Sequence, residues 1–83
     1  MAVEDKQIAM RVRREIVRRS LDASQLMIHV AHGHVELGGI IKPANKNAAI
    51  DMAKELEFAR ERVIRIPGVR DMTWRYLRFF GGA

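Results

Sequence analysis

The first quarter of the chain alternates apolar and charged residues with the period of a helix. Ile8, Val12 and Ile16 recur every four residues, so at about 100° per residue they lie on one helical face. We expect this helix to span residues 5–21, with Asp5 capping the free N–H groups of its first turn. The opposite face carries a row of arginines: Arg11, Arg14 and Arg18.

Residues 26–41 have the pattern of a β-hairpin that turns at His32-Gly33. A two-residue turn at this point pairs Val30 with Val35, and both are apolar. The same register sorts the remaining pairs, Ile28 with Leu37 on the apolar face and His29 with Glu36 on the polar face. A shift of one residue would mix the two faces, so the pattern itself specifies the pairing.

Glycines mark the expected turns and bends. Gly33 closes the hairpin, and Gly38-Gly39 indicate a bend, a bulge or a close approach of a helix to the strand. Gly68 follows Pro67 and ends the second helix. These glycines match no phosphate-binding motif, so we interpret Gly33, Gly39 and Gly68 as structural turn residues.

A second helix is expected over residues 44–64, after the strand is broken at Pro43 and with Asn45 as a capping residue. Its predicted buried stripe consists of Ala49, Met52, Leu56, Ala59 and Val63. Phe58 is an exception, because it projects from the charged side of this helix.

The last strand is expected over residues 69–79, where side chains alternate between two faces. Met72, Trp74 and Tyr76 share the face that we expect to be buried. Leu77 and Phe79 fall on the other face, and Phe80 follows directly, so these three apolar residues are predicted to be exposed.

The element order is therefore α-β-β-α-β in a single α+β domain over residues 1–83. We expect a three-stranded mixed sheet with both amphipathic helices packed on one face, because each helix needs an apolar surface to cover. Residues 80–83, which include two glycines, are expected to form a mobile tail.

The composition of the chain excludes several classes of function. The chain has 83 residues, a net charge of +5 and no cysteine, which excludes disulfides and thiolate chemistry. No stretch approaches the roughly 20 apolar residues of a membrane span. The basic charge favours acidic partners such as nucleic acid, anionic lipid headgroups or an acidic protein face.

The order of these elements and the positions of the glycines between them resemble the BON domain, a small bacterial module named for osmotically inducible and nodulation proteins. The matching residues are Ile8, Val12 and Ile16, the hairpin over 28–39, Ala49, Ala53 and Leu56, and Gly68 to Met72. The resemblance covers about residues 5–77, although the stretch from Gly39 to Gly68 is longer than the family pattern by roughly two helical turns.

This resemblance implies a non-enzymatic binding module associated with phospholipid surfaces, envelope proteins and stress responses. It transfers no catalytic residue and implies no cofactor. Family members are often exported. A complete chain that begins at Met1 would be expected in the cytoplasm, whereas an excised domain would be expected in the periplasm or at the envelope.

Three histidines, His29, His32 and His34, lie within six residues. In the predicted register, His29, His34 and Glu36 share one face of the hairpin, and imidazole and carboxylate groups are suitable zinc ligands. Without a fourth ligand, we expect a solvated sheet face with a His29–Glu36 pair and no metal.

We predict that the chain is a non-catalytic module that binds anionic phospholipid surfaces or a protein partner. Cationic attraction and apolar anchoring would come from Arg11, Arg14, Arg18, Arg75, Arg78, Phe58, Leu77, Phe79 and Phe80. Two alternatives stay open. The chain could be a small basic nucleic-acid-binding domain, or a homo-oligomeric subunit that associates through its open sheet face or an edge strand.

Overall fold

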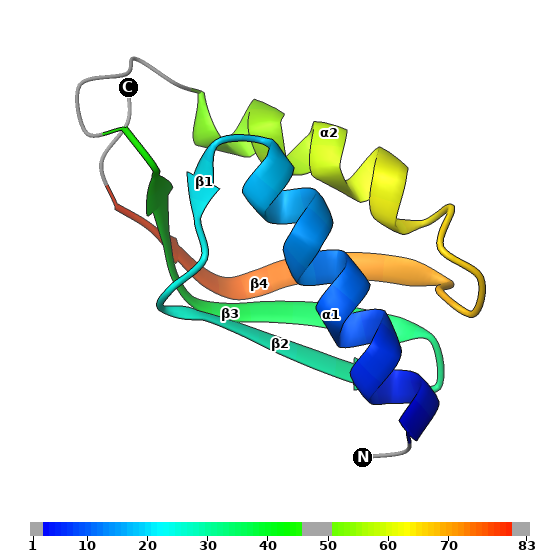
Figure 1. The fold of residues 1–83 in the computed structure, drawn as a ribbon. Helices are drawn as coiled ribbons and strands as arrows, with labels where there is room; N and C mark the ends of the chain where they lie inside the picture. The colour runs from blue at the N-terminus through cyan, green and yellow to red at the C-terminus, as the bar shows by residue number, and fades with distance from the viewer. Residues whose placement is uncertain (1–2, 46–50, 81–83) are drawn as a thin grey trace.

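The computed structural model describes residues 3–45 and 51–80 (Figure 1). Two helices and four strands follow one another along the chain. Their bounds are α1 Val3–Arg18, β1 Leu21–Asp22, β2 Leu26–Ala31, β3 His34–Pro43, α2 Met52–Val63 and β4 Asp71–Phe79. The predicted α+β class is confirmed, whereas the predicted number of strands is wrong because β1 adds a fourth.

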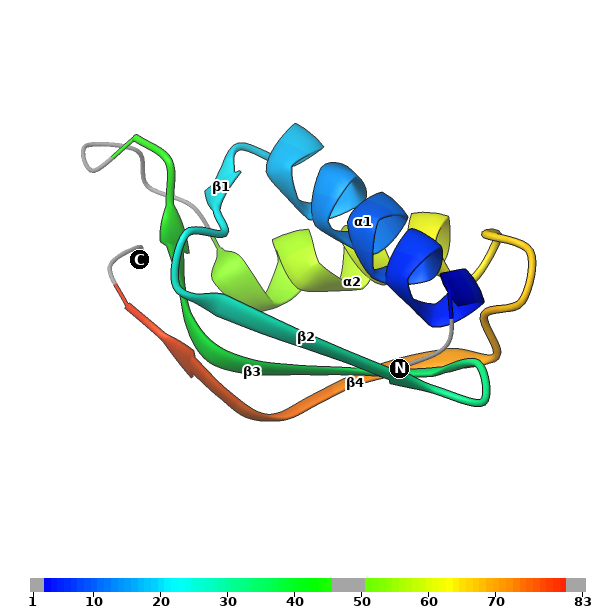
Figure 2. The ribbon, with the colours of Figure 1, turned by 60° about the horizontal axis from the view of Figure 1, so that its bottom comes forward.

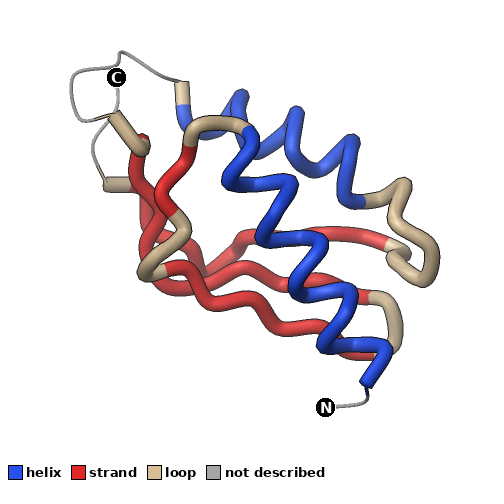
Figure 3. The backbone as a smooth tube through the Cα atoms, in the orientation of Figure 1, coloured by secondary structure: helices blue, strands red, loops and turns tan. Residues whose placement is uncertain are grey.

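The long strand β3 is the centre of the sheet. It pairs antiparallel with β2 and β1 and parallel with β4. Both helices lie on the same face of this sheet, as Figures 2 and 3 show, and the opposite face is left uncovered by the described residues. The molecule is therefore a two-layer structure with one helical face and one open sheet face.

The core lies between the two layers. Helix α1 contributes the predicted Ile8, Val12 and Ile16, which are all buried. Helix α2 contributes the described part of its predicted stripe, and Ala49 lies outside the described residues. The other buried apolar residues come from the strands and their connections: Leu21, Ala23, Leu26, Val30, Val35, Leu37, Ile41 and Met72.

The hairpin has the predicted register. Val30 pairs with Val35, Ile28 with Leu37, and His29 with Glu36. Its turn needs positive φ at both central residues, and the φ angles are 52° at His32 and 84° at Gly33. The other two predicted turn glycines, Gly39 and Gly68, also have positive φ, at 81° and 94°.

Helix α1 begins at Val3, so Asp5 lies within its first turn and is not the predicted cap. The helix ends three residues earlier than the predicted Leu21. Ser20 adopts a left-handed conformation with φ 60°, and this takes the chain out of the helix.

Leu21 of β1 then pairs with Pro43 of β3, so β3 continues two residues beyond the predicted end of the hairpin at Ile41. In β1, the Asp22 carboxylate accepts a hydrogen bond of 2.9 Å from the backbone N–H of Ser24, which lowers the pKa of Asp22 below its usual value.

Helix α2 begins at Met52, not at residue 44. Asp51 is its cap, with extended backbone angles and a carboxylate that accepts from the N–H of Lys54 at 3.2 Å. Ala44 and Asn45 are outside the helix, and the rest of the predicted first turn falls in residues 46–50, outside the described part of the chain. At its other end, the helix stops at Val63, one residue before the predicted end.

A β-bulge changes the two faces of β4. Thr73 pairs with Glu36, but Tyr76 pairs with Gly38, so β4 has one residue more than β3 between these pairs. Beyond the bulge the alternation is inverted. Tyr76 is exposed rather than buried, while Leu77 is half-buried and packs against the core, so both predictions were wrong. The strand itself begins at Asp71, two residues later than predicted.

Candidate functional site: a cationic face on the helical layer

The arginine row predicted on the first helix lines a cleft between α1 and α2. Arg11, Arg14 and Arg18 of α1 are all exposed, as the helical period requires when Val12 and Ile16 are buried. The cleft has a volume of about 410 Å³, and arginines from the end of α2 and the following turn complete it. Its lining residues are Arg11, Arg14, Glu15, Arg18, Arg62, Arg65, Ile66 and Pro67.

Glu15 is the only carboxylate among these lining residues. It pairs with Arg18 at 3.1 Å and with Arg62 at 3.9 Å, and its side chain is largely shielded from solvent. In the described part of the chain, Arg11, Arg14 and Arg65 form no ion pair. Five guanidinium groups around one carboxylate leave the cleft strongly positive, so it can hold anionic groups.

Apolar side chains lie along one side of the arginine row on the solvent side of α1. Met10 is 65% exposed and Val17 is 52% exposed, although both are large and apolar. They border a shallow hollow together with Arg14 and Arg18. We define the cationic face as Met10, Arg11, Arg14, Val17 and Arg18 of α1 with Arg62 and Arg65 beside them. This mixture of exposed apolar and basic groups on one helix is typical of interfacial helices.

Two neighbouring arginines have structural contacts. The guanidinium of Arg13 donates to the backbone carbonyls of Ala23 at 2.6 Å and Leu26 at 3.2 Å, and it thereby ties α1 to the start of β2. Arg19 pairs with Glu55 at 2.8 Å and lies over the Phe58 ring, 4.8 Å from its centroid.

Phe58 therefore contacts Arg19, although its position on the charged side of α2 gave no sign of this contact. The cation–π contact with Arg19 helps to join the end of α1 to α2. The ring still borders a second hollow, which shares Glu15, Arg18 and Arg62 with the cationic cleft. Of the predicted apolar anchors, Phe58 is the one that lies next to the arginine row.

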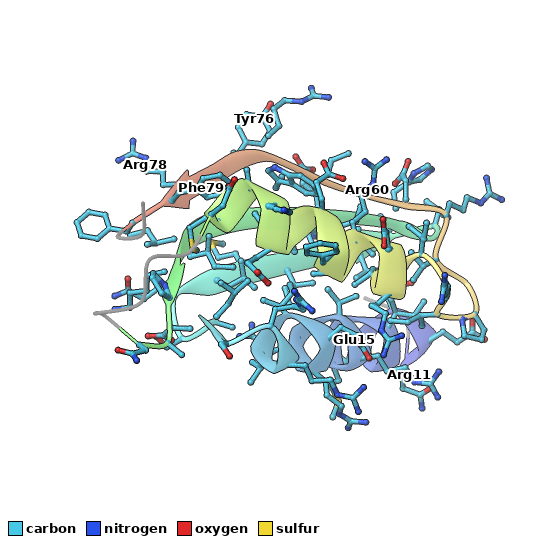
Figure 4. The ribbon with its side chains drawn as sticks, turned by 90° about the horizontal axis from the view of Figure 1, so that it is seen from above. Arg11, Glu15, Arg60, Tyr76, Arg78 and Phe79 are labelled. Atoms are coloured by element: carbon cyan, nitrogen blue, oxygen red, sulfur yellow. The ribbon has the colours of Figure 1, made fainter. Side chains whose placement is uncertain are left out.

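The predicted binding residues of β4 lie elsewhere. In Figure 4, Tyr76 and Arg78 point away from the helical layer, while Arg11 and Glu15 lie on the opposite side of the molecule. Phe79 pairs with Ile41 at the end of the sheet, and the Phe80 N–H donates to the Ile41 carbonyl. The predicted set of nine residues is thus divided between the helical layer and β4.

Sequence reasoning found the α1 arginines but missed four members of the cationic face. Met10 lies four residues before Arg14 and Val17 lies three residues after it, so the helical period could have placed both on the solvent side. Arg62 and Arg65 join the site only through the packing of α2 beside α1, which no local pattern reports.

The predicted histidine face is present but carries no three-ligand group among the described residues. His29 lies opposite Glu36, as predicted. The Nδ1 atom of His34 instead lies 3.0 Å from an Asp71 carboxylate oxygen, across from β3 to β4. Of the three weak metal candidates, His29 and Glu36 are thus neighbours across the hairpin, whereas His34 contacts Asp71 of β4.

No family model, curated protein or solved structure matches this chain. The resemblance to BON domains accordingly stays a prediction. Within residues 3–45 and 51–80, neither helix has the length and apolar character needed to cross a bilayer.

Proposed function

We propose that this protein is a non-catalytic module that docks on anionic phospholipid surfaces through the cationic face of its helical layer. The observation that carries the proposal is the exposure of Met10 and Val17 directly beside Arg14 and Arg18. A ligand that is only anionic would use the arginines alone. A membrane surface also offers an apolar boundary below its headgroups, where exposed side chains of this kind can insert.

The magnitudes are consistent with reversible binding. Each basic residue near an anionic leaflet contributes about 1 kcal/mol, and this contribution falls off within a Debye length of roughly 10 Å at ordinary ionic strength. Arg11, Arg14 and Arg65 can contact an anionic surface without breaking an ion pair, because they have no carboxylate partner in the described structure. Partial insertion of Met10 and Val17 adds a contribution that salt does not screen.

The proposal is tested by co-sedimentation with liposomes of increasing phosphatidylglycerol content in a phosphatidylcholine background. Arg14→Gln with Arg18→Gln removes two charges from the cationic face, and we expect roughly thirtyfold weaker binding, from a loss of about 2 kcal/mol. Arg75→Gln with Arg78→Gln is the matched control, because it removes the same charge from β4 and should bind nearly as wild type.

A second pair of substitutions separates membrane insertion from simple charge attraction. Met10→Ser with Val17→Ser keeps every charge, and we expect several-fold weaker binding that is most evident at high salt. Equal losses in the two arginine pairs would show that binding is not oriented. Strong binding to a DNA or RNA oligonucleotide that ignores the Met10 and Val17 substitutions would favour the nucleic-acid alternative.

A further inference from the structure

Ion pairs join the two helices and occupy two of the five arginines that line the cationic cleft. Helices α1 and α2 run in roughly opposite directions (Figure 1), and Arg19 near the end of α1 pairs with Glu55 of α2. One turn earlier on α1, Glu15 pairs with Arg62 of α2 at 3.9 Å and with Arg18 at 3.1 Å. Arg18 and Arg62 therefore already have a carboxylate partner.

The other three arginines of the cleft gather at one end of it. Arg11 and Arg14 precede Glu15 on α1, and Arg65 follows Arg62 after α2. Because the helices are antiparallel, these positions lie at the same end of the cleft. Arg11, Arg14 and Arg65 have no ion-pair partner among the described residues. This end of the cleft thus presents three guanidinium groups that are free to bind an anion.

The number of free guanidinium groups indicates which kind of phosphate they fit. A guanidinium binds phosphate through two parallel N–H donors, so three of them supply more donors and more charge than a phosphodiester can use. A diester has a single negative charge and only two unsubstituted oxygens. A phosphate monoester has three acceptor oxygens and a charge of about −1.5 to −2 at neutral pH. The monoester is therefore the better match for this end of the cleft.

We propose that the three free arginines, Arg11, Arg14 and Arg65, bind the headgroup of phosphatidic acid, a membrane lipid whose phosphate is a monoester. This inference rests on the proposed membrane docking and names the lipid that the docking selects. The phosphate of this lipid carries no further substituent, so it can enter between the two helices while Met10 and Val17 contact the apolar boundary below the headgroups.

Co-sedimentation with two kinds of vesicle tests the inference. Phosphatidic acid in phosphatidylcholine is compared with phosphatidylglycerol at about twice the mole fraction, so that the two surfaces have similar charge. We expect roughly tenfold tighter binding to phosphatidic acid, the effect of about one additional charge-assisted hydrogen bond. Equal binding would overturn this inference and leave the proposed function standing, whereas binding to neither vesicle would overturn both.

Arg11→Gln and Arg18→Gln form a matched pair of variants on one helix. Each removes one exposed arginine from the cationic face, so both should weaken binding to phosphatidylglycerol by a similar factor, roughly fivefold. Only Arg11→Gln should lose the preference for phosphatidic acid, because Arg18 is already paired with Glu15. An equal loss of preference in the two variants would overturn the assignment of the site to the free arginines.

The charge of the lipid provides a second measurement. Between about pH 8 and about pH 5 a phosphate monoester gains a proton, whereas the phosphodiester of phosphatidylglycerol stays singly charged, so the preference should disappear. Glu15 lines the cleft, and Glu4 and Glu61 border the neighbouring hollows. Protonation of any of these carboxylates would strengthen anion binding, so it cannot cause the expected loss. A preference that is unchanged over this range would overturn the assignment to a monoester.

Glycerol phosphate distinguishes a lipid from a soluble ligand, because it has the same phosphate monoester without acyl chains. Isothermal titration calorimetry should show much weaker binding than to phosphatidic acid vesicles, since Met10 and Val17 then have no membrane to enter. Binding as tight as that to the vesicles would overturn the lipid as the occupant of the cleft.

Discussion

Adjacent glycines on β3 have opposite structural requirements. Gly39 has a φ of 81°, and a Cβ built on it would lie 2.4 Å from the backbone carbonyl oxygen of Gln25. That oxygen also accepts the hydrogen bond of the Ile40 N–H, so it is held in place. Gly38 has neither constraint. The described fold therefore requires a glycine at position 39 and not at position 38.

Alanine substitution at each of these positions separates the two roles. We expect Gly39→Ala to lower the free energy of unfolding by about 2 kcal/mol or more, because a side chain is strained at positive φ and also meets the Gln25 carbonyl. Gly38→Ala should be neutral or stabilising by about 0.5 kcal/mol. Urea denaturation at low protein concentration measures both. An equal loss at the two positions would contradict this assignment.

At the scale of single elements, a feature that one short segment of sequence specifies can be predicted. A feature that arises only when a segment pairs with a distant strand cannot. The hairpin was predicted with its register, because the His32-Gly33 turn and the alternating apolar residues lie within one short segment. Strand β1 was missed, since two residues acquire strand character only by pairing with β3. The bulge in β4 was missed for the same kind of reason, because the extra residue is defined only against Glu36 and Gly38.

The same distinction holds for the candidate site. The helical period of α1 sufficed to place Arg11, Arg14 and Arg18 on the solvent side. The cleft itself needs Arg62 and Arg65, and the packing of two helices decides where those residues lie.

One face of helix α1 packs in the core, and the other is the proposed docking face. One valine substitution on each face tests these two roles. Val12 is fully buried and Val17 is 52% exposed. We expect Val12→Ala to cost about 2 kcal/mol of unfolding free energy, because it removes buried methyl groups and leaves a cavity. Val17→Ala should change stability by less than about 0.5 kcal/mol, since alanine is the better helix former.

Urea denaturation curves compare the two variants, and liposome binding provides the second measurement. Val17→Ala should bind phosphatidylglycerol liposomes more weakly while Val12→Ala, kept below its unfolding transition, should bind as wild type. A large loss of stability in Val17→Ala would show that this side chain belongs to the fold and not to a docking face.

At the scale of the whole molecule, exposed arginines lie on two opposite sides. Arg11 belongs to the cationic face of the helical layer, whereas Arg78 of β4 points away from the helices (Figure 4). The cationic face is confined to one side because α1 and α2 both cover the same face of the sheet (Figure 2). A chain that docks through this face therefore turns its open sheet face away from the membrane.

This one-sided arrangement predicts that the protein coats anionic vesicles without joining them. Wild-type protein should sediment with phosphatidylglycerol vesicles and leave the particle size measured by light scattering unchanged, because each chain has one cationic face. Arg14→Gln with Arg18→Gln should sediment less and should also leave the vesicle size unchanged. Clustering of vesicles by the wild type would contradict the arrangement, because the protein would then have to contact two membranes through different surfaces.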